Sequence, residues 1–169
     1  MPGSGKSTVG KLLARRLGLP FTDSDHVLEQ RMGCPIRTYF EQQGEERFRD
    51  IEQAVIADLC ADPGTGVLAT GGGAVLREAN RRHLHGQAYV IYLRSSPDQV
   101  FQRVRHDRKR PLLQVDDPLE RLKALHAQRD PLYRETAHLT MDTGRPSLQT
   151  LVNMIVMQLE LSGEAGAIA

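Results

Sequence analysis

Gly3-Ser4-Gly5-Lys6-Ser7-Thr8, close to the start of the chain, is the stretch from which the rest of the sequence is best interpreted. It matches the second half of the phosphate-binding pattern G-x-x-x-x-G-K-[ST], with Gly5, Lys6 and Ser7 in the last three places. In such a loop, glycines let backbone N–H groups surround phosphate oxygens, and the helix that begins there points its positive end at the anion. Residues 3–8, here called the phosphate loop, are therefore expected to bind the phosphates of a nucleotide.

The phosphate loop also predicts what should flank it. Apolar residues recur at helical spacing from Val9 to Leu17 and Gly18 ends the pattern, so a helix should begin near Lys6. Such loops normally follow a buried strand, and the first glycine of the pattern would fall immediately before Met1. We expect the authentic start to lie upstream and to encode that strand. A chain that truly began at Met1 would lack it, which would put stability and ATP binding at risk.

The composition is that of a globular protein without a strong overall charge. The chain has 169 residues, of which 25% are charged and 40% hydrophobic, and its formal net charge is +1. These values predict one domain over residues 1–161 with a flexible tail at 162–169, and no binding to nucleic acid or to a membrane. Two cysteines, Cys34 and Cys60, lack disulfide or zinc spacing, which favours a cytoplasmic protein with reduced thiols.

Strand-like and helical patterns alternate along the chain, which predicts an α/β fold with a parallel sheet flanked by helices. Ser96 and Asp117 each precede a proline and have Gln or Glu three residues on, as at capped helix starts. The helical patterns within residues 26–60 are interrupted at 33–35 and at Gly44. The predicted strands cover residues 20–22, 66–70, 88–93 and 138–142, and the apolar stripe of the last helix covers residues 148–159.

Two carboxylates, Asp23 and Asp25, follow the first of these strands. Their spacing sends both side chains to one side of an extended segment, and ligands of open α/β sheets bind at such strand ends. One carboxylate could hold a hydrated Mg²⁺ ion while the other accepts a proton from an attacking hydroxyl. Taken alone, however, the pair fits turn and helix-cap residues better than a catalytic site.

Three further motifs are ambiguous when each is taken alone. Arg49 and Glu52 would be neighbours on a helix, and by themselves they fit a surface ion pair better than a binding site. Residues 71–73 are three glycines directly after a strand, which suits either the close approach of a ligand or a tight turn. The basic run that ends in Arg110-Pro111-Leu112-Leu113 suits either a lid over phosphates or a solvated loop.

The order and spacing of these motifs resemble the shikimate kinase family. The phosphate loop is followed by Asp-x-Asp, Phe-Arg-x-x-Glu at residues 48–52, the triple glycine, Arg-Pro-Leu-Leu, and Arg129 before Pro-Leu-Tyr. The resemblance extends over nearly the whole chain, as far as the loop at residues 142–146. It implies a P-loop NTPase-type fold, similar to that of nucleoside monophosphate kinases, with the usual first strand missing from this chain. It also implies transfer of the γ-phosphoryl group of ATP to the 3-hydroxyl of shikimate, with one Mg²⁺ per subunit, in a monomeric enzyme.

The resemblance assigns roles to particular residues. Asp25 would be the base, Lys6 and Arg110 would stabilise the transferring phosphoryl group, and the shikimate-binding region and the lid would span about residues 24–61 and 105–116. Ser7 would bind Mg²⁺ directly and Asp23 through water. Shikimate binding is assigned to Asp25, Arg49, Glu52, Gly71, Gly72, Gly73 and Arg129. ATP binding is assigned to Gly3, Ser4, Gly5, Lys6, Ser7, Thr8, Arg103, Arg110, Arg145 and Pro146.

Three other functions compete with this interpretation. A related small-molecule kinase, such as a gluconate kinase, would share the phosphate loop and lid but should lack the paired arginines and the triple glycine. A nucleoside monophosphate kinase would need a base-reading insertion, which the short helices within 26–60 do not supply. A nucleotide-binding protein without catalysis, or one impaired by its truncated start, would not need Asp25, Arg49 and Arg129 to meet at a second site.

Overall fold

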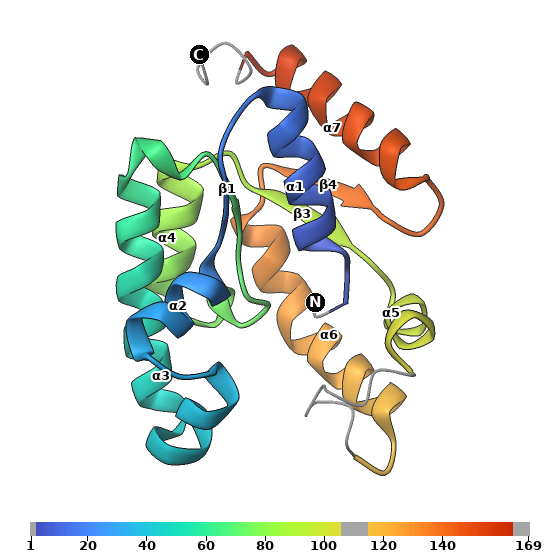
Figure 1. Ribbon diagram of the computed structural model, residues 1–169. Coiled ribbons are helices and arrows are strands. Elements are labelled where there is room, and N and C mark those ends of the chain that lie inside the picture. Colours follow the sequence, from blue (N-terminus) through green and yellow to red (C-terminus); the bar gives the residue numbers. More distant parts are fainter. Residues whose placement is uncertain (1–2, 106–114, 164–169) are drawn as a thin grey trace.

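The computed structural model describes residues 3–105 and 115–163, in which helices surround short parallel strands (Figure 1). The helices and strands are α1 (Lys6–Leu17), β1 (Phe21–Asp23), α2 (Ser24–Met32), α3 (Ile36–Ala61), η1 (Pro63–Thr65), β2 (Val67–Ala69), η2 (Ala74–Leu76), α4 (Glu78–Gln87), β3 (Ile91–Arg94), α5 (Pro97–Val104), α6 (Pro118–Thr136), β4 (Leu139–Asp142) and α7 (Leu148–Leu161).

The strands form two parallel pairs. β1 pairs with β2, so that Asp23 lies opposite Ala69, and β3 pairs with β4. Within residues 3–105 and 115–163 the pairs are separate two-stranded sheets, and no strand precedes α1. Each pair is joined by a crossover that contains helices, as parallel strands require. The pairing of β1 with β2 brings their carboxyl ends together, so that Asp23 at the end of β1, Asp25 just after it and the triple glycine after β2 lie at one edge.

Helices cover both pairs and bury the core between themselves and the strands. α1 and α7 pack together with β3 and β4 around an apolar cluster that includes Leu13, Leu93, Met141 and Ile155. In Figure 1, α2, α3 and α4 lie together beside β1, whereas α5 and α6 lie on the other side of the molecule. The consequence is that α3 and α6, which carry the two predicted carboxylate-binding arginines, approach the same strand ends from different sides.

Most of the predicted elements form where the local signals placed them. α1 begins at Lys6 and ends at Leu17, and the left-handed backbone of the next residue, Gly18 (φ 69°), suits a helix C-terminus. Ser96 and Gln99 form the predicted capping box, and Asp117 caps α6. Gly44 has non-helical angles (φ 81°, ψ 170°) and divides α3, as the interruption in the pattern predicted.

Two segments differ from the sequence-based expectation. β3 begins at Ile91 rather than at residue 88, because Ala88 still donates its N–H to Leu84 and the N–H of Val90 donates to the His138 ring. The pattern assigned no element to residues 74–87, where η2 and α4 form. α4 has no side-chain cap at its start, so the most specific local signal for a helix is missing there.

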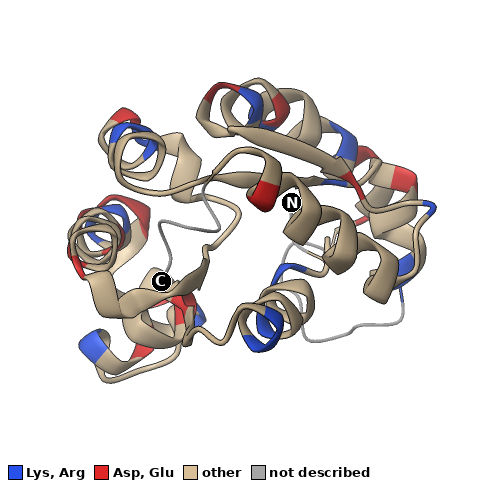
Figure 2. Ribbon diagram, turned by 90° about the horizontal axis from the view of Figure 1, so that it is seen from above, with Lys and Arg blue, Asp and Glu red and all other residues tan. Residues whose placement is uncertain are grey.

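Charged residues of both signs are interspersed along the helices (Figure 2). This distribution agrees with the net charge of +1 and with many short-range ion pairs on helix surfaces, such as those of Arg37 with Glu41 and of Arg82 with Glu78. Among the helices in the described ranges, none has both the length and the apolar character that crossing a bilayer requires.

Candidate active site

The phosphate loop meets α1 with its backbone turned for anion binding. Gly5 is the N-cap residue and has a left-handed conformation (φ 85°, ψ 16°) that other residues rarely adopt, and its carbonyl accepts the N–H of Val9. Ser4 is buried, and Lys6 Nζ donates to its hydroxyl at 3.4 Å. Ser7 and Thr8 are exposed in the first turn of α1. The backbone N–H groups at the start of a helix, together with the Lys6 side chain, form a positive end that suits phosphate oxygens.

Ser7 and Asp23 lie side by side across the gap between α1 and β1. The Ser7 hydroxyl donates to Asp23 Oδ2 at 2.9 Å, and the other oxygen of Asp23 caps α2 by accepting the N–H of Asp25 at 3.0 Å. Asp23 therefore does act as a helix cap, but that role leaves one carboxylate oxygen facing the phosphate loop. A hydroxyl and a carboxylate at this separation are hard oxygen donors of the kind that Mg²⁺ prefers, and Mg²⁺ usually takes only one or two protein ligands in phosphate sites.

Asp25 lies between the phosphate loop and the triple glycine. A Cβ atom on Gly71 would come within 2.8 Å of Asp25 Oδ1, so the glycine leaves the space that this carboxylate occupies. One side of Asp25 is open to solvent, yet desolvation by the surrounding protein, and then the nearby Asp23 and Glu52, raise its pKa to about 6, against the opposing charge of Lys6. A carboxyl group with this pKa is ionised at neutral pH and can accept a proton.

Arg49 and Glu52 form a buried pair, so the interpretation as a surface ion pair is wrong. Their exposed fractions are 9% and 2%, and Arg49 Nη1 donates to Glu52 Oε2 at 2.6 Å. The exposed Glu45 accepts from Arg49 Nη2 at 3.1 Å. A Cβ atom on Gly73 would lie within 2.5 to 2.8 Å of three atoms of the guanidinium group, which shows that Arg49 rests directly on the Gly73 backbone.

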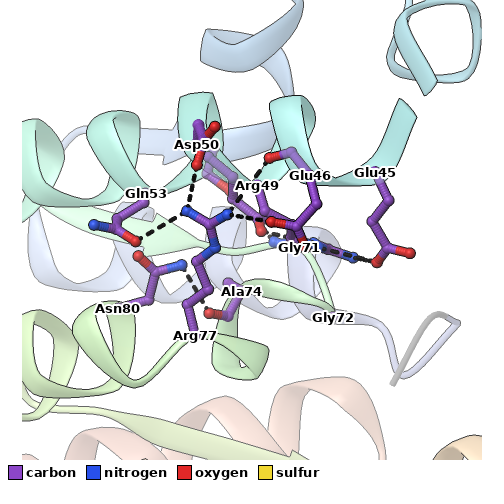
Figure 3. A network of polar contacts seen from close by, with 12 residues as sticks. Glu45, Glu46, Arg49, Asp50, Gln53, Gly71, Gly72, Ala74, Arg77 and Asn80 are labelled. Carbon is purple, nitrogen blue, oxygen red and sulfur yellow. Dashed lines mark hydrogen bonds and ion pairs between the residues drawn. The ribbon is translucent and has the colours of Figure 1, made fainter. Parts of the chain in front are cut away.

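Arg77 fixes the part of α3 that carries Arg49, although no motif in the sequence singled it out. It extends from the start of α4 toward α3, where it donates to Asp50 Oδ1 at 2.7 Å and to Gln53 Oε1 at 3.2 Å (Figure 3). Its other terminal nitrogen donates to the carboxylate of Glu46 at 3.2 Å. These contacts join α3, which carries Arg49, to the start of α4, which follows the triple glycine. The position of Arg49 relative to Gly73 is therefore fixed by a link between α3 and α4.

Arg129 approaches the same glycines from α6. Its Nε atom is buried and, within the described residues, has no hydrogen-bond partner, while its positive charge is close enough to Glu52 to oppose the rise in pKa that burial causes there. One turn further along α6, the Tyr133 hydroxyl donates to the carbonyl of Gly72 at 2.6 Å. The structure therefore brings Arg49 and Arg129, eighty positions apart in the sequence, close to the same carboxylate, Glu52.

Three residues assigned to ATP binding, Arg103, Arg145 and Pro146, lie near the end of α5 and in the loop after β4. Arg103 donates to the Ser95 hydroxyl at 3.2 Å and to the carbonyl of Thr143 at 3.0 Å, so it joins α5 to the loop that contains Arg145 and Pro146. Much of the Arg103 guanidinium is therefore used within the protein. Arg110 and most of the predicted lid lie outside the described residues.

A phosphate loop, a nearby hydroxyl–carboxylate pair, a carboxylate with a raised pKa and two buried arginine groups near Glu52 are together typical of an ATP-dependent small-molecule kinase. Residues 2–160 match the family model described as shikimate kinase. The chain belongs to the shikimate kinase family.

Similar proteins agree over almost the whole length. The shikimate kinase of Paracidovorax citrulli is 55% identical over 165 residues, which are 96% of this chain and 90% of that protein. That of Ralstonia nicotianae is 54% identical over 95% of this chain and 84% of its own. The solved shikimate kinase of Acinetobacter baumannii, in complex with shikimate, superposes with a TM-score of 0.87 at 43% identity, covering 96% of this chain and 89% of that one.

A more distant relative shows the same fold. The shikimate kinase from Aquifex aeolicus is 30% identical and superposes with a TM-score of 0.82, covering 98% of this chain and 95% of that one. Together these comparisons confirm the predicted fold class, the enzyme class and the shikimate kinase function, with ATP as co-substrate. The gluconate kinase, nucleoside monophosphate kinase and non-catalytic alternatives are not supported by any of the relatives described above.

Proposed function

We propose that the cluster around residues 71–73 is where this chain holds shikimate while the γ-phosphoryl group of ATP passes to the 3-hydroxyl. One observation above all carries this proposal. Arg49 is buried on the Gly73 backbone and held by Glu52. Asp25 lies against Gly71, which precedes Gly73 by two residues. A carboxylate-binding group and a proton acceptor therefore face one small space beside the phosphate loop.

The two arginines suit the carboxylate of the substrate. A guanidinium group makes paired hydrogen bonds to a carboxylate, which fixes both the position and the orientation of a small acid. Glu52 accepts from Nη1 of Arg49 and the exposed Glu45 accepts from Nη2, while the buried Nε of Arg129 lacks a partner among the described residues. An unsatisfied buried donor is costly, so an anionic substrate that accepts from it gains affinity.

Asp25 is the group best placed to accept the proton of the attacking hydroxyl. Phosphoryl transfer requires mainly that the acceptor oxygen be aligned and that the charge on the transferring group be stabilised. Lys6 lies close enough to Asp25 to affect its pKa, so the proton acceptor and a phosphate-binding cation are neighbours. We expect Arg110 in the predicted lid to add a second positive charge and to help exclude water.

Ser7 and Asp23 would hold the Mg²⁺ ion that such enzymes use with ATP. Their oxygens are 2.9 Å apart beside the phosphate loop, and Asp23 is already oriented by its bond to the N–H of Asp25. The ion would supply positive charge that compensates the phosphate oxygens. The monomeric state and the cytoplasmic location stay predictions, and light scattering at several protein concentrations would test the former.

A coupled assay of ADP release tests the function directly. We expect turnover with ATP, Mg²⁺ and shikimate, and at most slow background hydrolysis with gluconate or with a panel of nucleoside monophosphates in place of shikimate. Product identification by mass spectrometry would show addition of one phosphate to shikimate. Turnover of gluconate at a rate similar to or above that of shikimate would contradict the proposal.

A further inference from the structure

Tyr133 stands out among the buried polar groups that the mechanism above does not use. It lies in α6 one helical turn after Arg129, and residues four apart project from the same face of a helix. Its side chain is 8% exposed, and its hydroxyl donates to the carbonyl of Gly72 at 2.6 Å. This short bond joins the helix of one substrate-binding arginine to the middle residue of the triple glycine.

The same hydroxyl is also close to Arg129. Burial raises the pKa of Tyr133, and the neighbouring positive charge of Arg129 opposes that rise. A tyrosine hydroxyl can donate one hydrogen bond and accept others. Since its donor already points at Gly72, its lone pairs are left to face the guanidinium group. The Tyr133 oxygen therefore lies between Arg129 and the glycine backbone.

The glycine backbone in turn supports the other arginine. Gly73, the next residue after Gly72, carries the Arg49 guanidinium on its backbone. A change in the position of the Gly72 peptide would therefore be passed to Arg49, while loss of the hydroxyl would also leave Arg129 less constrained. Both groups that are proposed to bind one carboxylate depend on a single oxygen atom.

We propose that Tyr133 is a positioning residue for the substrate carboxylate: its hydroxyl fixes Arg129 relative to the Gly72–Gly73 backbone, and so sets the separation of the two arginines. The proposal rests on the proposed function, because it needs the carboxylate of shikimate to lie between Arg49 and Arg129. Tyr133 itself does not need to touch the substrate in this arrangement.

The chain offers a matched control for the hydroxyl. Tyr92 packs against Tyr133 with ring centroids 4.9 Å apart, and its exposed fraction is 6%. Its hydroxyl donates to Asp130 Oδ1 at 2.8 Å rather than to the triple glycine. Tyr92→Phe and Tyr133→Phe therefore remove the same atom from neighbouring buried rings, but only the second change removes the bond to Gly72.

The experiment measures KM and kcat for shikimate, KM for ATP, and thermal unfolding for the parent and both variants. We expect Tyr133→Phe to raise the shikimate KM about tenfold, as loss of one buried hydrogen bond to an oriented group allows, with the ATP KM changed less than about twofold. Tyr92→Phe should leave both KM values near those of the parent. Equal increases for the two substrates, or the same shikimate effect in both variants, would overturn the proposal.

A second substrate separates positioning from general loosening of the pocket. Shikimate methyl ester keeps the ring hydroxyls but has no carboxylate charge, so its KM should be high in the parent and nearly unchanged by Tyr133→Phe. A similar proportional loss for acid and ester would contradict an action through the arginines. If the parent neither turns over nor binds shikimate in calorimetry, the proposed function itself fails. An active parent with an unaffected Tyr133→Phe variant removes only this inference.

Discussion

In this site, single glycines leave the space that charged side chains occupy, and neighbouring carboxylates affect the pKa of one another. Gly71 and Gly73 leave room for Asp25 and for the Arg49 guanidinium, at distances where a Cβ atom would overlap them. Asp25 has its raised pKa first because the surrounding protein desolvates it, and then because two other carboxylates, Asp23 and Glu52, lie close to it. Both effects depend on a few ångströms, so they can be tested one residue at a time.

The pKa of Asp25 predicts how the rate depends on pH. With a pKa of about 6, Asp25 is the ionised base at pH 7 to 8 and becomes protonated as the pH falls through 6. We therefore expect kcat/KM for shikimate to fall about tenfold for each pH unit below about 5.5, measured in buffers of constant ionic strength. A profile that stays flat down to pH 4.5 would exclude Asp25 as the required base.

Asp25→Asn should stabilise the ligand-free protein while abolishing turnover. The folded protein holds the Asp25 proton more tightly than the unfolded chain does. The contribution of this proton to the free energy of unfolding is therefore fully present below pH 4 and is lost as the pH rises through about 6. At pH 8 the neutral amide of Asp25→Asn avoids that loss. The free energy of unfolding of the variant should therefore exceed that of the parent by on the order of 1 kcal/mol once solvent screening is allowed for. Urea unfolding at pH 8 and pH 4 measures the difference, which should vanish at the lower pH.

Turnover and nucleotide binding provide the functional part of that test. ATP binding by Asp25→Asn, measured by calorimetry, should remain within a few fold of the parent, since the phosphate loop is unchanged. Near-normal turnover would remove Asp25 from the role of base, whatever its effect on stability.

Gly73→Ala should impair shikimate binding without unfolding the protein. The backbone of Gly73 (φ −92°, ψ −6°) is accessible to alanine, but the new methyl group would lie 2.5 Å from Arg49 Nη1. Because a flexible side chain can move away, we expect Arg49 to shift and the shikimate KM to rise at least tenfold, with a small change in melting temperature. Gly86→Ala is the control: its methyl group meets nothing within 4 Å, and alanine favours a helix by up to about 1 kcal/mol.

At the scale of whole elements, α3 matters because it is divided. Gly44 interrupts the helix four residues before Phe48, which is buried against Leu28 and Val55. The second part of α3 is then fixed by Arg77, whose bonds to Glu46 and Asp50 join it to the start of α4. The interruption and this cross-link together determine the direction in which Arg49 leaves the helix.

Gly44→Ala should therefore strain α3 where it supports the site. The observed φ of 81° with ψ of 170° belongs to a region that only glycine occupies readily, so alanine should cost about 1 to 3 kcal/mol. Denaturant unfolding would measure this loss, and the shikimate KM should rise in parallel. Gly33→Ala is a useful comparison, since its φ of 70° and ψ of 12° lie in the ordinary left-handed region and should cost less. Equal losses of stability would argue against a special role for Gly44.

For the molecule as a whole, the site exists because distant elements meet at the carboxyl ends of β1 and β2. Arg49 comes from α3, Arg129 from α6, and the glycines from the segment after β2. The register that places Asp23 beside Ala69 brings the acidic pair to the same edge. Shikimate should therefore stabilise the folded protein through contacts to several elements at once, which raises the melting temperature as the ligand concentration rises.

The two arginines should act as a unit in this arrangement. Arg49→Ala and Arg129→Ala should each raise the shikimate KM by about 10- to 100-fold, because each removes charged hydrogen bonds, with little change in the ATP KM. The double variant should lose less than the product of the two effects, since both groups hold one carboxylate. Steady-state kinetics on all four proteins measures the coupling. Strictly multiplicative effects would mean that the arginines bind separate parts of the substrate.

Local signals in the sequence were sufficient for the family and for most of the elements, but not for η2 and α4. The start of α1, the caps at Ser96 and Asp117 and the interruption at Gly44 depend on residues within one helical turn, so they can be recognised without knowing the fold. The order of the motifs then indicated the family. Pro131 shows the limit of such signals, because a proline favours a helix boundary and yet α6 continues through it to Thr136.

Only the tertiary structure decided which of the polar residues form the site. From their spacing, Arg49 and Glu52 suited a surface pair, and they are buried because α3 faces the glycines after β2. No local signal gives the contacts of Arg77 or of Tyr133, whose residue type was noted only within the motif after Arg129, since their partners lie 24 to 61 positions away in the chain. Burial and long-range hydrogen bonds depend on which faces of distant elements meet, and a pattern of neighbouring residues carries no information about that.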